Sequence, residues 1–137
     1  MEVIEKAGLI NVSVSATKSI LIVDDSDLIQ ERIAAICSEV ENIGIIYQAR
    51  NSEEAYRKFN LYSQDVVILD IHIPGDNGIK VLENIRNKNK KTIIIILTNY
   101  PYEQYRKKCM ELGADYFLEK SGDLNRIFEI CAKLVIE

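Results

Sequence analysis

The chain has few of the residues on which many metal and redox sites depend. Its 137 residues include one histidine and three cysteines, and the cysteines are far apart in the sequence. No two of them have the spacing of a metal-binding or redox motif, and each falls in a segment predicted to be helical. We therefore interpret Cys37, Cys109 and Cys131 as reduced thiols of the core, which is typical of a cytoplasmic protein.

Two further absences concern charge and hydrophobicity. The formal net charge is -4, which argues against a nucleic-acid-binding surface as the main activity. No apolar run approaches the length that spans a membrane, and the N-terminus has no basic segment followed by an apolar one, so we expect neither a membrane span nor a signal peptide. With 47% hydrophobic and 28% charged residues, the chain suits one globular domain.

What the chain does contain is a series of short apolar runs that end in polar residues. A run of this kind is typical of a strand buried on both faces of a parallel sheet. We expect three of these runs to be neighbouring parallel strands. They are Ile20–Val23 before Asp24 and Asp25, Val66–Leu69 before Asp70, and Ile93–Leu97 before Thr98.

The whole pattern alternates such strands with amphipathic helices. Five strands alternating with five helices indicate an α/β doubly wound parallel sheet of the flavodoxin-like kind, with strand order 2-1-3-4-5 and helices on both faces. The predicted strands are residues 19–24, 44–49, 65–70, 92–97 and 115–118.

The predicted helices carry start and stop signals. They run to about 40 from a cap at 25, 26 or 27, to about 62 from a cap at 51 or 52, and over about 79–87, 101–112 and 124–136. Pro101 suits the first turn of the fourth helix, and Gly113 suits its end. Helical spacing places Leu28 on the inner face of the first helix and Phe128 on that of the last.

Residues 1–18 carry weaker signals. The segment Val12–Ala16 alternates in the manner of a strand, but it is short and rich in serine. We predict a flexible leader over residues 1–18 and one domain over residues 19–137. An extra edge strand and a docking tail are the alternatives for the leader.

The predicted strand order brings three carboxylates together. In this order the switch point lies between the first and third strands, and ligands bind beyond the carboxyl ends of the strands there. Asp24, Asp25 and Asp70 stand at that point. Like charges so close cost on the order of 1 to 4 kcal/mol per pair at a surface, so we expect a compensating cation. Hard oxygen ligands without a histidine or cysteine cluster favour Mg²⁺.

Two further residues indicate phosphoryl transfer at the same edge. Lys120 follows the fifth strand, and its ammonium can keep Asp70 ionised and pair with an incoming phosphoryl oxygen. Thr98 offers a hydroxyl donor to another oxygen. A metal, a cation and a hydroxyl around one carboxylate make Asp70 a candidate nucleophile that forms an aspartyl phosphate.

This set of strand-end residues resembles the site of the receiver domain of bacterial two-component response regulators. The resemblance covers about residues 19–136, with local support from Pro74, Gly78 and the segment Gly113–Asp115. The residues that carry it, in chain order, are Asp24, Asp25, Asp70, Thr98 and Lys120.

By this resemblance, Asp70 accepts a phosphoryl group from a phosphohistidine on a sensor histidine kinase or a histidine phosphotransfer protein. Asp25 binds Mg²⁺ directly and Asp24 binds it directly or through water, together with Asp70 and the backbone carbonyl of His72. The resemblance thus implies a signalling switch that catalyses its own Mg²⁺-dependent phosphorylation and dephosphorylation, and not an enzyme with a separate substrate.

The resemblance also implies a route for output. Thr98 and Lys120 contact the phosphoryl oxygens, and Thr98 and Phe117 form the switch. The face built from the fourth helix, the fifth strand and the fifth helix meets a downstream protein or a second copy of the chain, without nucleic acid or membrane. The implied protein is CheY-like and acts in cytoplasmic phosphorelay signal transduction.

Two features depart from the family pattern. Ser121 stands where many receivers have proline after the lysine, so the geometry of that loop is left open. The chain also ends without an output domain, as a stand-alone receiver or a fragment of a longer regulator would.

Two other functions are compatible with part of the pattern. A haloacid-dehalogenase-like phosphatase places its nucleophile in an Asp-x-Asp motif, and Asp25-Ser26-Asp27 fits that motif but leaves Asp70 unexplained. A receiver that only docks a partner and takes no phosphate is the other alternative, and the complete set of site residues argues against it.

Overall fold

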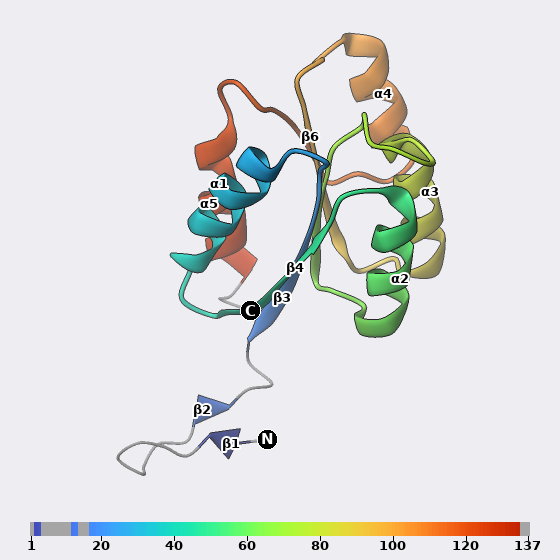
Figure 1. Cartoon of the computed structure of the whole chain (residues 1–137). Helices are drawn as coiled ribbons and strands as arrows, with labels where there is room; N and C mark the ends of the chain where they lie inside the picture. Colours follow the sequence, from blue (N-terminus) through green and yellow to red (C-terminus); the bar gives the residue numbers. More distant parts are fainter. Residues whose placement is uncertain (1, 4–11, 14–16, 135–137) are drawn as a thin grey trace.

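The computed structural model describes residues 2–3, 12–13 and 17–134. Within them, five parallel strands form the main sheet in the order β4-β3-β5-β6-β7 (Figure 1), which confirms the predicted order 2-1-3-4-5. Each of these strands begins and ends within one residue of its predicted bounds. The strands are β3 (Lys18–Val23), β4 (Ile43–Ala49), β5 (Val66–Leu69), β6 (Ile93–Thr98) and β7 (Tyr116–Glu119).

Helices cover both faces of this sheet (Figure 1). Helices α1 and α5 pack on one face, over side chains that include Ile22 and Ile68. Helices α2, α3 and α4 pack on the other face, over Leu21 and Val67. Successive residues of each central strand thus enter two separate cores, as a strand buried on both faces requires. The helices are α1 (Asp27–Ser38), α2 (Ser52–Tyr62), α3 (Gly78–Lys88), α4 (Glu103–Glu111) and α5 (Leu124–Leu134).

The described part of the N-terminal segment forms a separate pair of strands. β1 (Glu2–Val3) pairs antiparallel with β2 (Val12–Ser13), and this pair does not join the five-stranded sheet. The extra edge strand considered for Val12–Ala16 is therefore wrong for its first two residues. Residues 1, 4–11 and 14–16 of the predicted flexible leader, and residues 135–137 at the other end, lie outside the described residues.

Side chains close the first turns of three helices. Ser26 accepts the backbone N–H of Ile29 at 3.2 Å, and Asn51 and Asn77 do the same for α2 and α3 at 2.8 and 3.1 Å. Each of these side-chain oxygens satisfies a backbone donor that has no partner within its helix. Gly113 follows α4 with φ at +108°, so it takes the left-handed conformation expected of a residue that ends a helix.

The start of α4 differs from the prediction. Pro101 lies before the helix, which begins at Glu103, and Tyr102 at the N-cap position makes no side-chain cap. The reason is a tight turn at the end of β6. The N–H of Tyr102 donates to the carbonyl of Tyr100 at 2.8 Å, so Pro101 belongs to that turn and not to the first turn of the helix.

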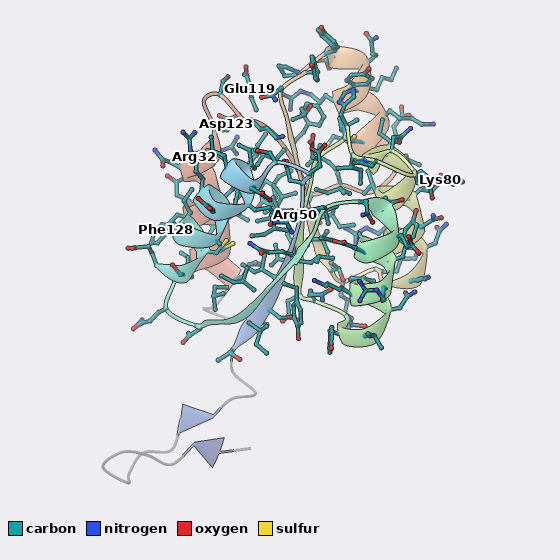
Figure 2. The ribbon with its side chains drawn as sticks, in the orientation of Figure 1. Arg32, Arg50, Lys80, Glu119, Asp123 and Phe128 are labelled. Carbon is teal, nitrogen blue, oxygen red and sulfur yellow. The ribbon has the colours of Figure 1, made fainter. Side chains whose placement is uncertain are left out.

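Two residues expected to face the core lie at the surface instead. Leu28 is 56% exposed and Phe128 is 42% exposed, and Figure 2 shows Phe128 on the outer side of the molecule. In α1 the predicted Ile33 and Cys37 are buried together with Gln30, whose Nε2 donates to the carbonyls at the ends of two strands, among them Ala49 at 2.9 Å. In α5 Ile130 is buried beside the predicted Ile127 and Cys131. Satisfying buried carbonyls thus outweighs burying one more leucine in α1.

The three cysteines are buried free thiols, as predicted. Two of them meet, which their separation in the sequence did not indicate. Cys37 on α1 and Cys131 on α5 share a hydrogen bond, and this bond together with burial raises the pKa of Cys37. The Cys37 thiol therefore stays protonated and serves the core.

Candidate functional site

Asp24, Asp25 and Asp70 converge because β3 and β5 are neighbouring strands that pair in register. Val23 pairs with Leu69, so Asp24 and Asp70, the next residues, leave the sheet side by side. Carboxylate oxygens of Asp24, Asp25 and Asp70 all lie within 4.8 Å of one another. Asp24 is 1% exposed and Asp70 is 6% exposed, whereas Asp25 faces solvent.

Lys120 is the cation of this cluster. Its Nζ lies 2.7 Å from Oδ2 of Asp24 and 3.1 Å from Oδ2 of Asp70. The backbone N–H of Lys120 donates to the carbonyl of Thr98 at 2.9 Å, so the end of β6 fixes where the lysine leaves β7. The predicted approach of Lys120 to the acids is therefore present, and Lys120 contacts two of the three acids directly.

Burial and charge act in opposite directions on these groups. Burial raises the pKa of Asp70, and the nearby Lys120 charge works against that rise. Burial also works to lower the pKa of Lys120, but its hydrogen bond with Asp24 and the charges of both acids outweigh burial and raise it. Lys120 is thus held as a cation, and Asp70 is a carboxylate whose ionised form depends on the cations around it.

Each buried acid uses its second oxygen for its own loop. Oδ1 of Asp24 accepts the N–H of Ser26 at 2.9 Å. Oδ1 of Asp70 accepts the N–H of His72 at a longer 3.3 Å. The Asp70 carboxylate is therefore held less tightly by its surroundings than that of Asp24, which leaves it the freer of the two to react.

The two predicted switch residues lie on neighbouring strands. Thr98, fully buried, accepts the N–H of Tyr100 at its hydroxyl (2.9 Å), and among the described residues no hydrogen bond joins it to the acids. Phe117 is 5% exposed and pairs in register with Ile96. The guanidinium of Arg106 lies 4.7 Å from the centroid of the Phe117 ring. The structure therefore shows the ring in a buried position beneath an arginine.

An aromatic cluster lies beside the acids, around His72 and Tyr100. The exposed side chain of His72 meets the rings of Tyr100 and Tyr105 edge-on, with centroids 4.7 and 6.0 Å away, and Tyr102 adjoins both tyrosines. The sequence places His72 and Tyr100 at the same edge, because each stands two residues beyond a strand-end site residue. The contacts of Tyr102 and Tyr105 with this pair had no such signal.

Gly78 lies against the backbone of Asp70, and glycine is required there by lack of space and not by turn formation. It opens α3, and a Cβ built on it would lie 2.1 Å from the carbonyl oxygen of Asp70. Its N–H donates to the carbonyl of Ile71 at 2.7 Å. Only glycine lets the helix start this close to the backbone that carries Asp70.

The loop after Lys120 is closed without the proline seen in many receivers. The N–H of Glu119 donates to Oδ2 of Asp123 at 2.8 Å, and Ser121 Oγ donates to Oε2 of Glu119 at 2.9 Å. Figure 2 shows Glu119 and Asp123 close together at this turn. Local hydrogen bonds thus define the geometry of this loop, which the presence of serine at position 121 did not predict.

The response regulator receiver domain matches residues 20–132. The chain belongs to this family. It is a CheY-like receiver domain with an acidic pocket of Asp24, Asp25 and Asp70, and receivers of this kind are the phosphoacceptors of two-component signalling.

Two curated relatives illustrate where such domains occur. A protein-glutamate methylesterase/protein-glutamine glutaminase of Treponema denticola is 32% identical over 124 residues, which are 85% of this chain and 33% of that protein. The DNA-binding transcriptional activator EvgA of Escherichia coli is 35% identical over 109 residues, which are 78% of this chain and 52% of that protein. The chain thus spans between a third and about half of the length of these relatives.

Solved structures agree on the fold. A chain of the CheX-CheY-BeF3-Mg²⁺ complex of Borrelia burgdorferi is 30% identical with a TM-score of 0.78, covering 88% of this chain and 90% of that chain. A LuxR-family response regulator of Aurantimonas is 25% identical with a TM-score of 0.79, covering 88% of this chain and 86% of that chain.

The donor set of the pocket fits Mg²⁺. Three carboxylates supply hard oxygen ligands within a few ångströms, and the cluster contains no histidine nitrogen or cysteine sulfur. Such a set favours Mg²⁺ over the softer transition metals. The exposure of Asp25 leaves the pocket open on one side, where bound water and a phosphoryl oxygen can complete the coordination.

Proposed function

We propose that Asp70 is the phosphoacceptor of this receiver and that Asp24, Asp25, Asp70 and the carbonyl of His72 hold Mg²⁺. One observation supports the choice of Asp70 above the others. Its strand lies between β3, which brings the other two acids, and β6, which ends at Thr98. Asp70 therefore stands centrally, with the metal ligands on one side and the hydroxyl on the other.

The residues around Asp70 suit an in-line transfer. A carboxylate oxygen of Asp70 attacks the phosphorus of a phosphohistidine, and the P–N bond breaks. The electron pair of that bond stays on the imidazole nitrogen, which takes up a proton from water. Lys120, already bonded to Asp70, pairs with one phosphoryl oxygen. Thr98 accepts an N–H in the present state, so its own O–H remains available to donate to another oxygen. Mg²⁺, when bound, supplies neutralisation of the charge on the phosphoryl oxygens.

We propose a histidine kinase or a histidine phosphotransfer protein as the donor, because the family implies a histidine kinase partner. The domain then catalyses its own phosphorylation and dephosphorylation. Its described helices include none long and apolar enough to cross a bilayer. We place the reaction in the cytoplasm, with residues 19–137 as the receiver and residues 1–18 as a leader.

For output we propose the surface formed by α4, β7 and α5. A phosphoryl group adds charge near -2 at the strand ends, which draws the Thr98 hydroxyl toward it. Phe117, already buried under Arg106, lies on the next strand, where we expect its ring to fill the space that Thr98 leaves. A change in the fraction of molecules in which the Phe117 ring is buried alters the surface that a downstream protein or a second copy contacts.

The test of the proposed function is chemical labelling. Incubation with phosphoramidate and Mg²⁺ should add one phosphoryl group, and peptide mapping should locate it on the segment that contains Asp70. Amide NMR spectra with and without beryllofluoride and Mg²⁺ should show shifts that extend from the loop after Asp70 to α4 and β7. Absence of labelling, or shifts confined to that loop, would contradict the acceptor and the output surface respectively.

The structure weakens the phosphatase alternative. In that alternative, Asp25 and Asp27 would face one substrate. Asp27 instead opens α1 and pairs with Arg50 at the surface, outside the cluster of three acids. The Asp-x-Asp spacing is therefore part of a helix start.

A further inference from the structure

The loop between β5 and α3 is attached to α2 by hydrogen bonds. The N–H of Ser52 donates to the carbonyl of Pro74 at 3.1 Å, and Ser52 Oγ accepts the N–H of Asp76 at 2.8 Å. Gly75, at φ +90°, lies so close that an added Cβ would be 2.3 Å from Ser52 Oγ. The first turn of α2 thus fixes the backbone of the loop.

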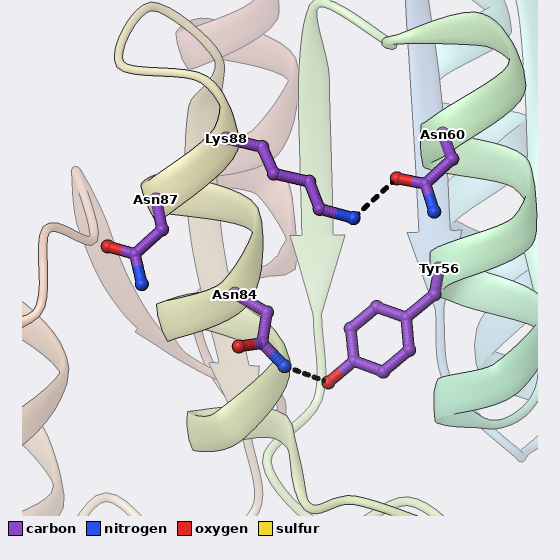
Figure 3. Close-up of a pocket in the computed structure, with 5 residues that line it drawn as sticks. All are labelled: Tyr56, Asn60, Asn84, Asn87 and Lys88. Carbon is purple, nitrogen blue, oxygen red and sulfur yellow. Dashed lines mark hydrogen bonds between the residues drawn. The ribbon is translucent and has the colours of Figure 1, made fainter.

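A second attachment lies one helical turn further along α2. The hydroxyl of Tyr56 donates to Oδ2 of Asp76 at 2.9 Å and accepts from Nδ2 of Asn84 on α3 at 2.7 Å. Figure 3 shows the Asn84 bond at a pocket between the two helices, which Lys88 and Asn60 also line. One phenol therefore links α2, the loop and α3. We call the Tyr56–Asp76 bond the tether.

The opposite end of the same loop carries the metal site. It begins at Asp70 and includes His72, whose carbonyl is the proposed ligand. Near the site, the N–H of His72 donates to Asp70 at 3.3 Å, which is at the weak end of the usual range, and the N–H of Gly78 donates to the carbonyl of Ile71 at 2.7 Å. The carbonyl of His72 lies between these bonds and the attachments to α2, so contacts outside the site also help to fix its position, and the tether is one that a side chain outside the site supplies.

We propose that Tyr56 is a positioning residue for the metal site, acting through Asp76 to hold the loop in the conformation that binds Mg²⁺. This inference rests on the proposed function, because it concerns the same metal site. Neither residue belongs to the acidic cluster. Their role would be to order the loop before the metal arrives, so that less conformational freedom is lost on binding.

The experiment measures Mg²⁺ affinity by calorimetry and amide hydrogen exchange of residues 71–76 in the metal-free protein. Tyr56→Phe and Asp76→Ala should each weaken Mg²⁺ binding about three- to tenfold, less than the tenfold to hundredfold typical of groups bonded directly to a ligand. Both should speed exchange of the Asp76 amide. Asp76→Asn keeps an acceptor oxygen and should stay within about twofold of the unmodified chain.

The controls separate positioning from stability and from charge. Tyr62 lies on the same helix with its ring stacked on Tyr47, so Tyr62→Phe should change neither measurement. The double variant Tyr56→Phe, Asp76→Ala should bind Mg²⁺ no more weakly than Tyr56→Phe alone, because the phenylalanine has already removed the tether.

Several outcomes would overturn the tether. Unchanged affinity in Tyr56→Phe would do so, and so would an Asp76→Asn variant as weak as Asp76→Ala, because the carboxylate charge would then be responsible. Failure of the proposed function is distinct: the unmodified chain would itself bind no Mg²⁺ and accept no phosphoryl group from phosphoramidate.

Discussion

Acids stand at both ends of the central sheet, but only at the carboxyl ends of the strands do they face one another. At the amino ends, Asp65 accepts the N–H of Ser19 at 2.9 Å. Asp115 accepts the N–H of Ile94 at 2.9 Å and pairs with Arg86 at 2.9 Å. Each of these carboxylates accepts a backbone N–H from a neighbouring strand, and the charge of Asp115 is also paired with Arg86.

At the carboxyl ends the same residue type is used differently. Asp24 and Asp70 share one lysine, and Asp25 remains exposed beside them. The negative charge there exceeds what Lys120 neutralises, so the pocket retains capacity for a further cation. Position at a strand end does not by itself make an acid reactive. An acid becomes reactive where its charge has no full partner and the site is open to solvent.

The largest expected effect is on phosphoryl labelling, and it should distinguish the acids at the carboxyl ends of the strands from those at the amino ends. Asp70→Asn should abolish labelling by acetyl phosphate or phosphoramidate, because the amide offers no carboxylate nucleophile. Asp65→Asn, at the amino ends, should be labelled as the unmodified chain is. Intact-mass spectrometry after a fixed incubation measures both. An Asp70→Asn variant that still takes up one phosphoryl group would show that another acid is the acceptor.

The second effect concerns the affinity of the pocket for Mg²⁺. Asp25→Ala should weaken Mg²⁺ binding by at least about tenfold, since removal of a ligand exceeds the loss of a supporting contact. Binding by the unmodified chain should also weaken as pH falls, because the ligands must be ionised. Asp27→Ala removes the same charge two residues along but outside the cluster, and should have little effect. Calorimetric titration of both variants would decide, and equal affinities would refute the role of Asp25.

A third effect tests the backbone beneath Asp70. Gly78→Ala should destabilise the fold by about 1 to 3 kcal/mol, the usual cost of overpacking, although alanine is the better helix former. Gly122 has no atom within 4 Å of an added Cβ, so Gly122→Ala should stay within about 0.5 kcal/mol. Urea unfolding of the two variants provides the measurement. Equal stabilities would mean that α3 can shift away from Asp70 without cost.

Much of this arrangement could be predicted from the sequence. Apolar runs such as Val66–Leu69 have one interpretation in a parallel sheet, so the strands, their order and the convergence of the acids follow from pattern and topology. The course of the chain around the site could not be predicted in the same way. Pro101 has a local preference for a helix start, but the turn that closes on Tyr100 prevails.

Residues with two competing roles account for the other errors. Spacing alone favours Leu28 over Gln30 as a core residue, because hydrophobic periodicity takes no account of carbonyls that need a donor. The contact of Cys37 with Cys131 depends on how α1 and α5 pack, which no local signal records. Thr98 was placed correctly at its strand end, but the bond from Tyr100 that holds its hydroxyl was not predictable.

A smaller effect concerns the lifetime of the phosphoryl group. The rings of His72 and Tyr100 meet beside the acids and should flank the path of the attacking water. His72→Ala and Tyr100→Ala should each change the dephosphorylation rate by a few-fold, on the order of 1 kcal/mol in the barrier. Tyr102→Ala, further along the cluster, is the matched control. Decay at the parent rate in both of the first two variants would remove the aromatic cluster from the mechanism.

The smallest effect is one of stability, and its sign should differ between the two ends of the sheet. Burial raises the pKa of Asp70, so ionised Asp70 costs the metal-free fold stability at neutral pH. Asp70→Asn should therefore raise the melting temperature in the presence of a chelator. As pH falls through the raised pKa of Asp70, the unmodified chain loses that penalty and the advantage of the variant should vanish. Asp115→Asn should instead lower the melting temperature at neutral pH, because it removes the charge paired with Arg86. Thermal unfolding from pH 7 to pH 4 compares the two, and a destabilising Asp70→Asn would mean that Lys120 compensates the buried acids fully.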